Sequence, residues 1–150
     1  MMKKLLSIIC LVAAALLLFG VAGCGEDDSS AATLTKKQFI KSAEGICEQA
    51  ETEQLKKATK YLQGHPGAEE EDAVIPAGLP PIEEELNKLE ALGLPKGGEA
   101  EIEAFLDALQ VALDQAKEDP GSVLAQQGNP FEKPNKIGSK YGLKACASNP

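Results

Sequence analysis

The chain has 150 residues and a formal net charge of −8, with 23 acidic residues against 15 lysines and no arginine. This length suits one ordinary domain, and the negative charge predicts repulsion from nucleic acid phosphates and from anionic lipid. Without arginine or tryptophan, the chain lacks bidentate guanidinium recognition of phosphate or carboxylate and the aromatic residue most typical of interface hot spots.

The first predicted element is an export signal at residues 1–23. Lys3 and Lys4 form a positive n-region, residues 5–19 form an uncharged apolar run, and small residues then lead to a cysteine. The segment ends in Val21-Ala22-Gly23-Cys24, which resembles the lipobox of bacterial lipoprotein precursors. This resemblance implies a diacylglyceryl group on the Cys24 sulfur, cleavage just before Cys24, and a protein held at the extracytoplasmic face of the cell membrane.

An uncleaved transmembrane anchor is the alternative for the same segment, because residues 5–23 carry no charge and a spanning helix needs about 20 apolar residues. The acids that follow at 26–28, without stop-transfer lysines, favour the cleaved signal. Cleavage would remove Cys10 and two lysines, so the net charge would fall from −8 to −10. Attachment would then depend on the acyl chains, of which two give stable anchoring.

Three cysteines remain after cleavage, and acylation of Cys24 would leave Cys47 and Cys146. Disulfides persist outside the cytosol, so these two residues are expected to form a structural bridge. A redox or nucleophilic pair is the alternative. It is disfavoured because the chain has no C-x-x-C motif and its one histidine lies in a Gly/Pro segment.

Residues 24–34 are small and polar and predict a flexible tether before the domain at 35–146. Thr35 and Gln38 fit a capping box that opens a first helix, which Gly64 ends. Its core face recurs at three- and four-residue spacing: Phe39, Ala43, Ile46, Cys47 and Ala50. Beyond residue 51 this stripe weakens, and Leu55, Ala58, Tyr61 and Leu62 continue it rotated around the helix.

Residues 64–80 contain three prolines and three glycines and predict a flexible loop. His65 is the only histidine, and no cysteine or suitably spaced acid accompanies it, so no metal site is expected here. The acids at 69–72 are adjacent rather than alternating around a glycine, which favours a solvated charge run over a calcium loop.

Two further main helices are expected at 81–92 and 99–118, and the three glutamates at 83–85 meet the positive end of the dipole of the former. The 99–118 segment has a continuous apolar stripe and stops at Asp119-Pro120. Ala104, Ala108 and Val111 gather on its other side. This second, shallow face either receives another helix of the same domain or stays exposed as a contact surface.

Residues 120–130 predict at most one helical turn. A last short helix is expected from about 133 to 141, with Gly142 in the left-handed position after it and a frayed tail at 147–150. No segment shows the alternation of a strand. The predicted fold is therefore all-α: a small bundle of three main helices and one or two short ones, tied by one disulfide.

A second resemblance covers two short segments, Phe39-Ile40-x-x-Ala43-x-x-Ile46-Cys47 and Tyr141-Gly142-Leu143-x-x-Cys146. They look like segments of uncharacterised small lipoproteins of high-GC Gram-positive bacteria. The resemblance implies a helical domain closed by Cys47 and Cys146, and it brings no activity with it.

Enzymatic activity is not expected, because no serine or cysteine has a plausible histidine partner and no Gly-rich loop is placed to cradle phosphate. No cofactor, metal or nucleic acid is expected either. The leading hypothesis is a non-catalytic envelope lipoprotein whose helical domain contacts a protein or a cell-wall component. The alternative is a lipoprotein that binds a small, lipid-like molecule in an apolar pocket between helices, and a cavity of several hundred Å³ would favour it.

Overall fold

The computed structural model describes residues 33–148, and this part of the chain is mostly helical and contains no strand. The predicted all-α bundle is confirmed. Four helices have ten residues or more, and three one-turn elements connect them. The elements are α2 (Lys36–Gly64), α3 (Glu70–Ala73), the π turn η1 (Val74–Gly78), α4 (Leu79–Ala91), α5 (Glu99–Glu118), the 3₁₀ turn η2 (Pro120–Leu124) and α6 (Glu132–Tyr141).

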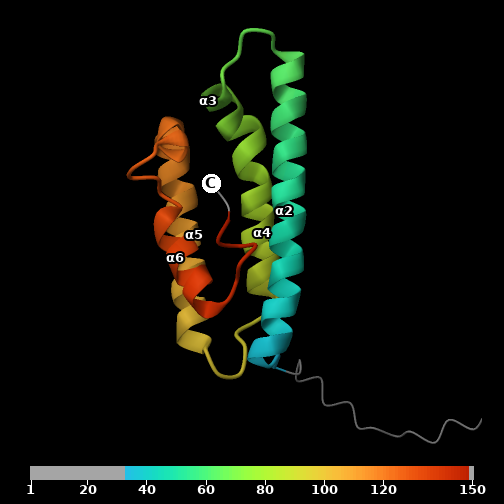
Figure 1. The fold of residues 1–150 in the computed structure, drawn as a ribbon, viewed down its shortest axis with the longest axis vertical. Helices are drawn as coiled ribbons and strands as arrows, with labels where there is room; N and C mark the ends of the chain where they lie inside the picture. The colour runs from blue at the N-terminus through green and yellow to red at the C-terminus, as the bar shows by residue number, and fades with distance from the viewer. Residues whose placement is uncertain (1–32, 149–150) are drawn as a thin grey trace, which may run out of the picture. The chain divides into compact units, whose positions relative to one another are not determined.

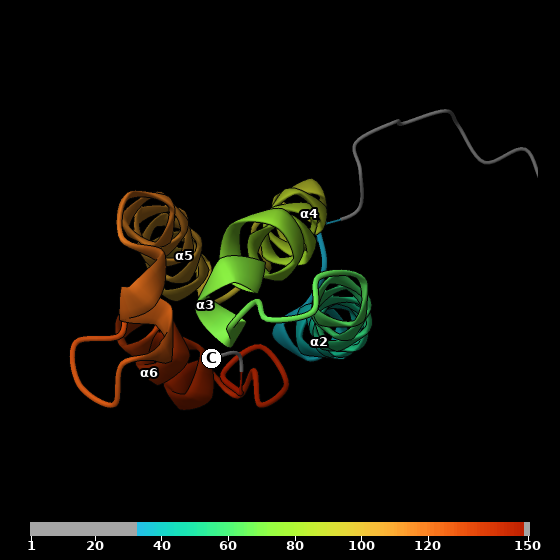
Figure 2. The ribbon, with the colours of Figure 1, turned by 90° about the horizontal axis from the view of Figure 1, so that it is seen from above.

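The helices follow one another around the core in the order α2, α4, α5 and α6 (Figures 1 and 2). α4 packs against α2 and α5, and α6 packs against α5. The segment after α6 fills the remaining space between α6 and α2 (Figure 2). Its Leu143 and Cys146 are buried, so this segment is part of the core.

α2 begins where the sequence predicts. Gln38 N–H donates to Thr35 Oγ1 at 3.4 Å and Thr35 N–H donates to Gln38 Oε1 at 3.0 Å, which completes the capping box. The predicted apolar face is buried except for Ile46, which is half-buried. The helix then runs without interruption to Gly64.

The predicted flexible loop at 64–80 is wrong over most of its length, because residues 70–80 are helical. Asp72 accepts a hydrogen bond from the Glu69 N–H at 2.8 Å and so caps α3. Pro76 has no N–H to donate, and the chain passes it in a π turn, in which Leu79 N–H donates to the Val74 carbonyl. Pro80 and Pro81 lie in the first turn of α4, where a missing N–H is tolerated.

α5 has the predicted bounds, and α6 begins one residue before the predicted start. Gly142 adopts φ 110° after α6, and the Leu143 N–H donates to the Gly138 carbonyl at 2.9 Å. This pattern is the Schellman ending that the sequence predicts. The single predicted turn within 120–130 is η2.

The core lies wholly within the described domain, between Phe39 and Cys146. The sequence predicts a frayed tail at 147–150. In the structure, however, the Ala147 N–H donates to the Leu143 carbonyl and the Ser148 N–H donates to the Ala145 carbonyl, so these two residues are hydrogen-bonded. The predicted signal, Cys24 and most of the predicted tether lie outside the described residues, as do 149 and 150. None of the helices between residues 33 and 148 combines the length and apolar composition that a membrane crossing requires.

Candidate functional site

An apolar groove of about 510 Å³ lies at the end of the domain that is farther from the start of α2. The second half of α2 forms one wall, the segment from α3 to the start of α4 forms another, and η2 completes it. Its large apolar side chains are Leu55, Leu62, Val74, Leu79, Val123 and Leu124. The volume is within the range of about 300–1,000 Å³ that is typical of small-molecule sites.

Local sequence features explain why the groove forms. The apolar residues of α2 rotate around the helix beyond residue 51, so Leu55, Ala58 and Leu62 face away from the main core stripe and line the groove. On the other wall, the π turn places Val74 and Gly78 along the same space.

Two of the leucines in the groove remain exposed in the folded domain. Leu55 is 70 % exposed and Leu124 is 48 % exposed. A single exposed leucine needs no explanation, but two that line the same groove mark a contiguous apolar surface of the kind that binds a ligand or a partner.

The polar side chains that line the groove are either uncharged or acidic. Gln54, Thr59 and Ser148 supply uncharged polar groups, whereas Glu51 and Glu70 supply carboxylates. None of the described residues that line the groove is basic. The groove therefore suits a neutral or cationic apolar molecule better than an anionic one.

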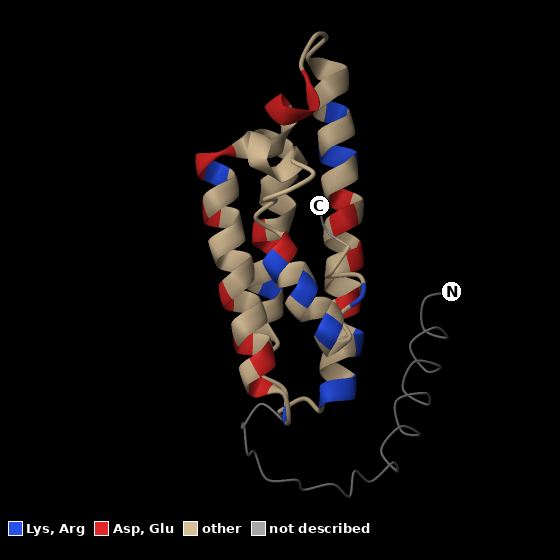
Figure 3. Cartoon of the chain, turned by 60° about the vertical axis from the view of Figure 1, so that its left-hand side comes forward, with Lys and Arg blue, Asp and Glu red and all other residues tan. Residues whose placement is uncertain are grey.

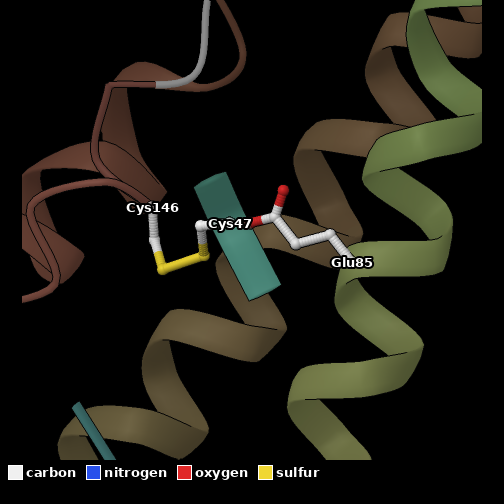
Figure 4. Close-up of side chains that lie close together, drawn as sticks. All are labelled: Cys47, Glu85 and Cys146. Carbon is white, nitrogen blue, oxygen red and sulfur yellow. A yellow bond between two sulfur atoms is a disulfide. The ribbon is translucent and has the colours of Figure 1, made fainter. Parts of the chain in front are cut away.

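The second cluster of reactive side chains is Cys47, Glu85 and Cys146 in the core (Figure 4). The predicted disulfide is present, with an S–S distance of 2.02 Å and a Cα–Cα distance of 4.9 Å. Glu85 from α4 points towards it (Figure 4), and the ligand-capable atoms of the three residues lie within 4.8 Å of one another. Because metals bind the thiolate form of cysteine, the disulfide leaves the Glu85 carboxylate as the only conventional metal ligand of this cluster.

Glu85 is 2 % exposed, and this burial is not predicted from the sequence. The glutamates at 83–85 are predicted to lie at the positive end of a helix that begins at Pro81, but α4 begins two residues earlier, at Leu79. Glu85 consequently lies two residues further from the helix start, and it shares the buried side of α4 with Ile82 and Leu86.

The three residues of the predicted second face of α5 do not share one environment. Ala104 is exposed and Val111 is 51 % exposed, whereas Ala108 is buried. Since α5 packs against both α4 and α6, Ala108 belongs to the interior and is not available to a partner. Only Ala104 and Val111 remain at the surface, and neither lines the groove.

His65, for which no metal role is expected, lies at the exposed end of α2. Its ring stacks on Tyr61 with centroids 4.2 Å apart, and its Nδ1 lies 2.8 Å from the Tyr61 carbonyl oxygen. These two contacts give the ring a local structural role at the helix end.

Tyr141 is the buried polar side chain with the least satisfied environment. Its ring packs edge-on against Phe39, and the Lys36 Nζ lies 4.0 Å from the ring centroid. Within the described range, its hydroxyl has no hydrogen-bond partner. Burial, together with the charges of Glu101 and Glu99, raises the pKa of the Tyr141 phenol above its usual value.

We expect Tyr141→Phe to change the free energy of unfolding by less than about 1 kcal/mol at pH 7, or to raise it, because the hydroxyl that is lost has no partner. Above a pH of about 10 the unfolded tyrosine ionises while the folded one stays neutral. Stability of the parent chain should therefore fall as pH rises through the raised pKa, and the variant should lose this part of the fall. Urea unfolding at pH 7 and pH 10.5 measures both effects, and equal pH dependence of the two proteins would contradict the assignment.

Comparison with known protein families, curated proteins and solved structures finds no match to this chain.

Proposed function

We propose that the chain is a lipid-anchored protein of the extracytoplasmic cell envelope whose non-catalytic helical domain binds a small apolar ligand in the groove. The observation that carries the binding role is the groove of about 510 Å³ with exposed Leu55 and Leu124. This observation favours the lipid-like ligand, which was the alternative hypothesis from the sequence.

The ligand class follows from the charges of the groove. An apolar body would contact the leucine and valine side chains, and a neutral or cationic head group would lie near Glu51 or Glu70. A fatty acid or another anionic amphiphile would meet these two carboxylates without a compensating lysine in the groove. Neutral acylglycerols and amine-bearing amphiphiles are therefore the first candidates.

The anchor is supported by the sequence alone, through the apolar run and the lipobox that ends at Cys24. The intact mass of the protein extracted from membranes tests it directly. The expected mass lacks residues 1–23, includes the acyl additions at Cys24, and is two hydrogens lower because of the Cys47–Cys146 disulfide. A mature product that retains residues 1–23, or an unmodified Cys24, would contradict the anchor without affecting the groove.

We expect Leu55→Glu to weaken binding of a neutral monoacylglycerol about tenfold or more. The change removes the contact of one leucine side chain, and burial of such a side chain contributes about 1.5–3 kcal/mol. Because Leu55 is 70 % exposed, the domain should still fold. Displacement of a neutral fluorescent dye from a purified chain that starts at residue 25 gives the affinity.

Val111→Glu is the matched control, since Val111 is 51 % exposed on α5 and lies outside the groove. It introduces the same charge and should leave the affinity within about twofold. Equal weakening by both variants would show that the added charge acts non-specifically. No binding by the parent chain would overturn the proposed ligand class.

A protein partner is the second candidate, because the groove is open at Leu55 and Leu124 and could accept an amphipathic helix through anchors at i, i+3, i+4 and i+7. Crosslinking on live cells and recovery through this chain distinguishes the two candidates. A crosslink from position 55 to one protein, absent from position 111, would favour the partner.

A further inference from the structure

Seven lysines gather in three segments that are far apart in the sequence. Residues 36–43, 132–141 and 142–148 contain these seven lysines and one acidic residue, Glu132. All seven are exposed: Lys36, Lys37, Lys41, Lys133, Lys136, Lys140 and Lys144. Figure 3 shows them in one region of the view, on α6, on the segment that follows it and on the first turns of α2. We call this region the lysine face.

Three contacts hold the segments of the lysine face together. The Cys47–Cys146 disulfide joins α2 to the segment after α6. The Ala145 N–H donates to Glu44 Oε1 at 3.0 Å, and the Lys36 Nζ lies 4.0 Å from the centroid of the Tyr141 ring. The fold therefore holds together the three segments that carry the lysines.

The lysine face is not neutralised by ion pairs. Between residues 33 and 148, the salt bridges join Lys56, Lys88 and Lys117 to glutamates, and none of them includes a lysine of this face. Besides Glu132, acids on packed elements include Glu44 and Glu48 on the next turns of α2, and Glu99 and Glu101, whose charges act on Tyr141. Glu44 accepts a hydrogen bond from the Ala145 N–H and keeps its negative charge.

The net charge of the chain does not describe this face, because part of the acidic charge lies far from it. α2 has 29 residues and is about 43 Å long at 1.5 Å per residue. The acids at 69–72 follow its far end, at a distance of several Debye lengths, since the Debye length is about 8 Å at physiological ionic strength. An anionic surface that contacts the lysine face would therefore be screened from the acids at 69–72.

We propose that the lysine face contacts the anionic phospholipid head groups of the membrane that carries the anchor. The described chain enters α2 directly beside Lys36 and Lys37. Residues 25–34 span at most about 35 Å when fully extended, which keeps the start of α2 within reach of the bilayer surface. Lysines close to an anionic membrane each strengthen its association with a protein.

This contact would also orient the groove. The lining residues 51–62 of α2 lie roughly 23–39 Å along the helix from Lys36, at 1.5 Å per residue. With the lysine face on the head groups, the groove would lie at the part of the domain that is remote from the anchored end. The inference rests on the proposed anchor for its biological setting, but the contact itself can be measured without the lipid.

The test uses a chain that starts at residue 25, because the core and the disulfide lie wholly within residues 39–146. Binding is measured by flotation with vesicles of equal parts phosphatidylglycerol and phosphatidylcholine, and with pure phosphatidylcholine vesicles. We expect binding to the anionic vesicles only, with loss in 0.5 M salt. The triple variant Lys133→Gln, Lys136→Gln and Lys140→Gln should bind at least about tenfold more weakly.

The matched control is the triple variant Lys56→Gln, Lys57→Gln and Lys60→Gln, which changes the net charge equally through exposed lysines outside the face. It should bind within about threefold of the parent chain, and circular dichroism confirms that both variants fold. Equal weakening by the two variants, or no binding to anionic vesicles at 20 mM salt, would overturn the proposal. Binding to a soluble polyphosphate but not to the vesicles would also overturn it and would indicate an anionic wall polymer. None of these results depends on whether Cys24 is acylated.

Discussion

Loss of the Cys47–Cys146 disulfide is expected to lower the free energy of unfolding by about 3–5 kcal/mol. The two cysteines are separated by 99 residues, and the chain-entropy relation gives nearly 5 kcal/mol for a loop of that length. Single domains are usually stable by only about 5–15 kcal/mol. Without the bond, the segment after α6 would be held between α6 and α2 by packing and hydrogen bonds alone.

Urea unfolding followed by circular dichroism measures this effect in the oxidised chain, in the chain reduced with dithiothreitol, and in the double variant Cys47→Ala with Cys146→Ala. Reduction should destabilise the parent chain and leave the double variant unchanged. Each single variant should cost about as much as the double variant, because both break the same bond. A difference below about 1 kcal/mol between oxidised and reduced chains would contradict the expectation.

Gly98→Ala is expected to destabilise the domain by about 2–4 kcal/mol. Gly98 has φ +114°, which disfavours any residue with a Cβ, and a Cβ placed there would lie 2.7 Å from Tyr141 Cε2 and 2.8 Å from its hydroxyl oxygen. The backbone conformation costs about 1–2 kcal/mol. Displacement of the buried tyrosine ring, which is fixed against Phe39, adds a penalty typical of overpacking, about 1–3 kcal/mol.

Gly97→Ala separates the two contributions. Gly97 has φ +79°, but a Cβ there would meet no described atom within 4 Å, so only the backbone cost should apply. Thermal unfolding of the two variants gives the difference, which we attribute to Tyr141. If both variants lose the same stability, the close approach of Tyr141 to Gly98 does not limit this position.

The sequence was sufficient to predict the features that depend on local spacing. The Thr35 capping box, the bounds of α5 and the Gly142 ending of α6 follow from rules that involve residues within one or two turns. The disulfide partner was also predictable, because acylation of Cys24 would leave one possible pair.

The failures of sequence prediction concern context beyond one turn. Proline and glycine content indicated a loop at 64–80, whereas packing against α2 stabilises a helix from residue 70, and a π turn accommodates Pro76. Glu85 of α4, whose burial was not predicted, lies in the core. The sequence shows that the apolar residues Leu55, Ala58 and Leu62 rotate around α2. It does not show that η1 and η2 lie opposite them, and the groove forms only because they do.

The lysine face was hidden for a related reason. Composition sums charges over the chain and gives −8, whereas a surface responds to charges within about one Debye length. The fold brings Lys36 over the ring of Tyr141 at the end of α6, and no spacing rule connects segments so distant in sequence.

The bond between Cys47 and Cys146 also constrains how the chain can mature. In a chain exported from its N-terminus, Cys47 would reach the oxidising compartment 99 residues before its partner, and throughout that interval the nearest other thiol after the signal would be Cys24. A thioether on Cys24 would withdraw this competitor before Cys146 is available. Lipid attachment would then select the correct pairing during oxidative folding as well as fix the protein in place.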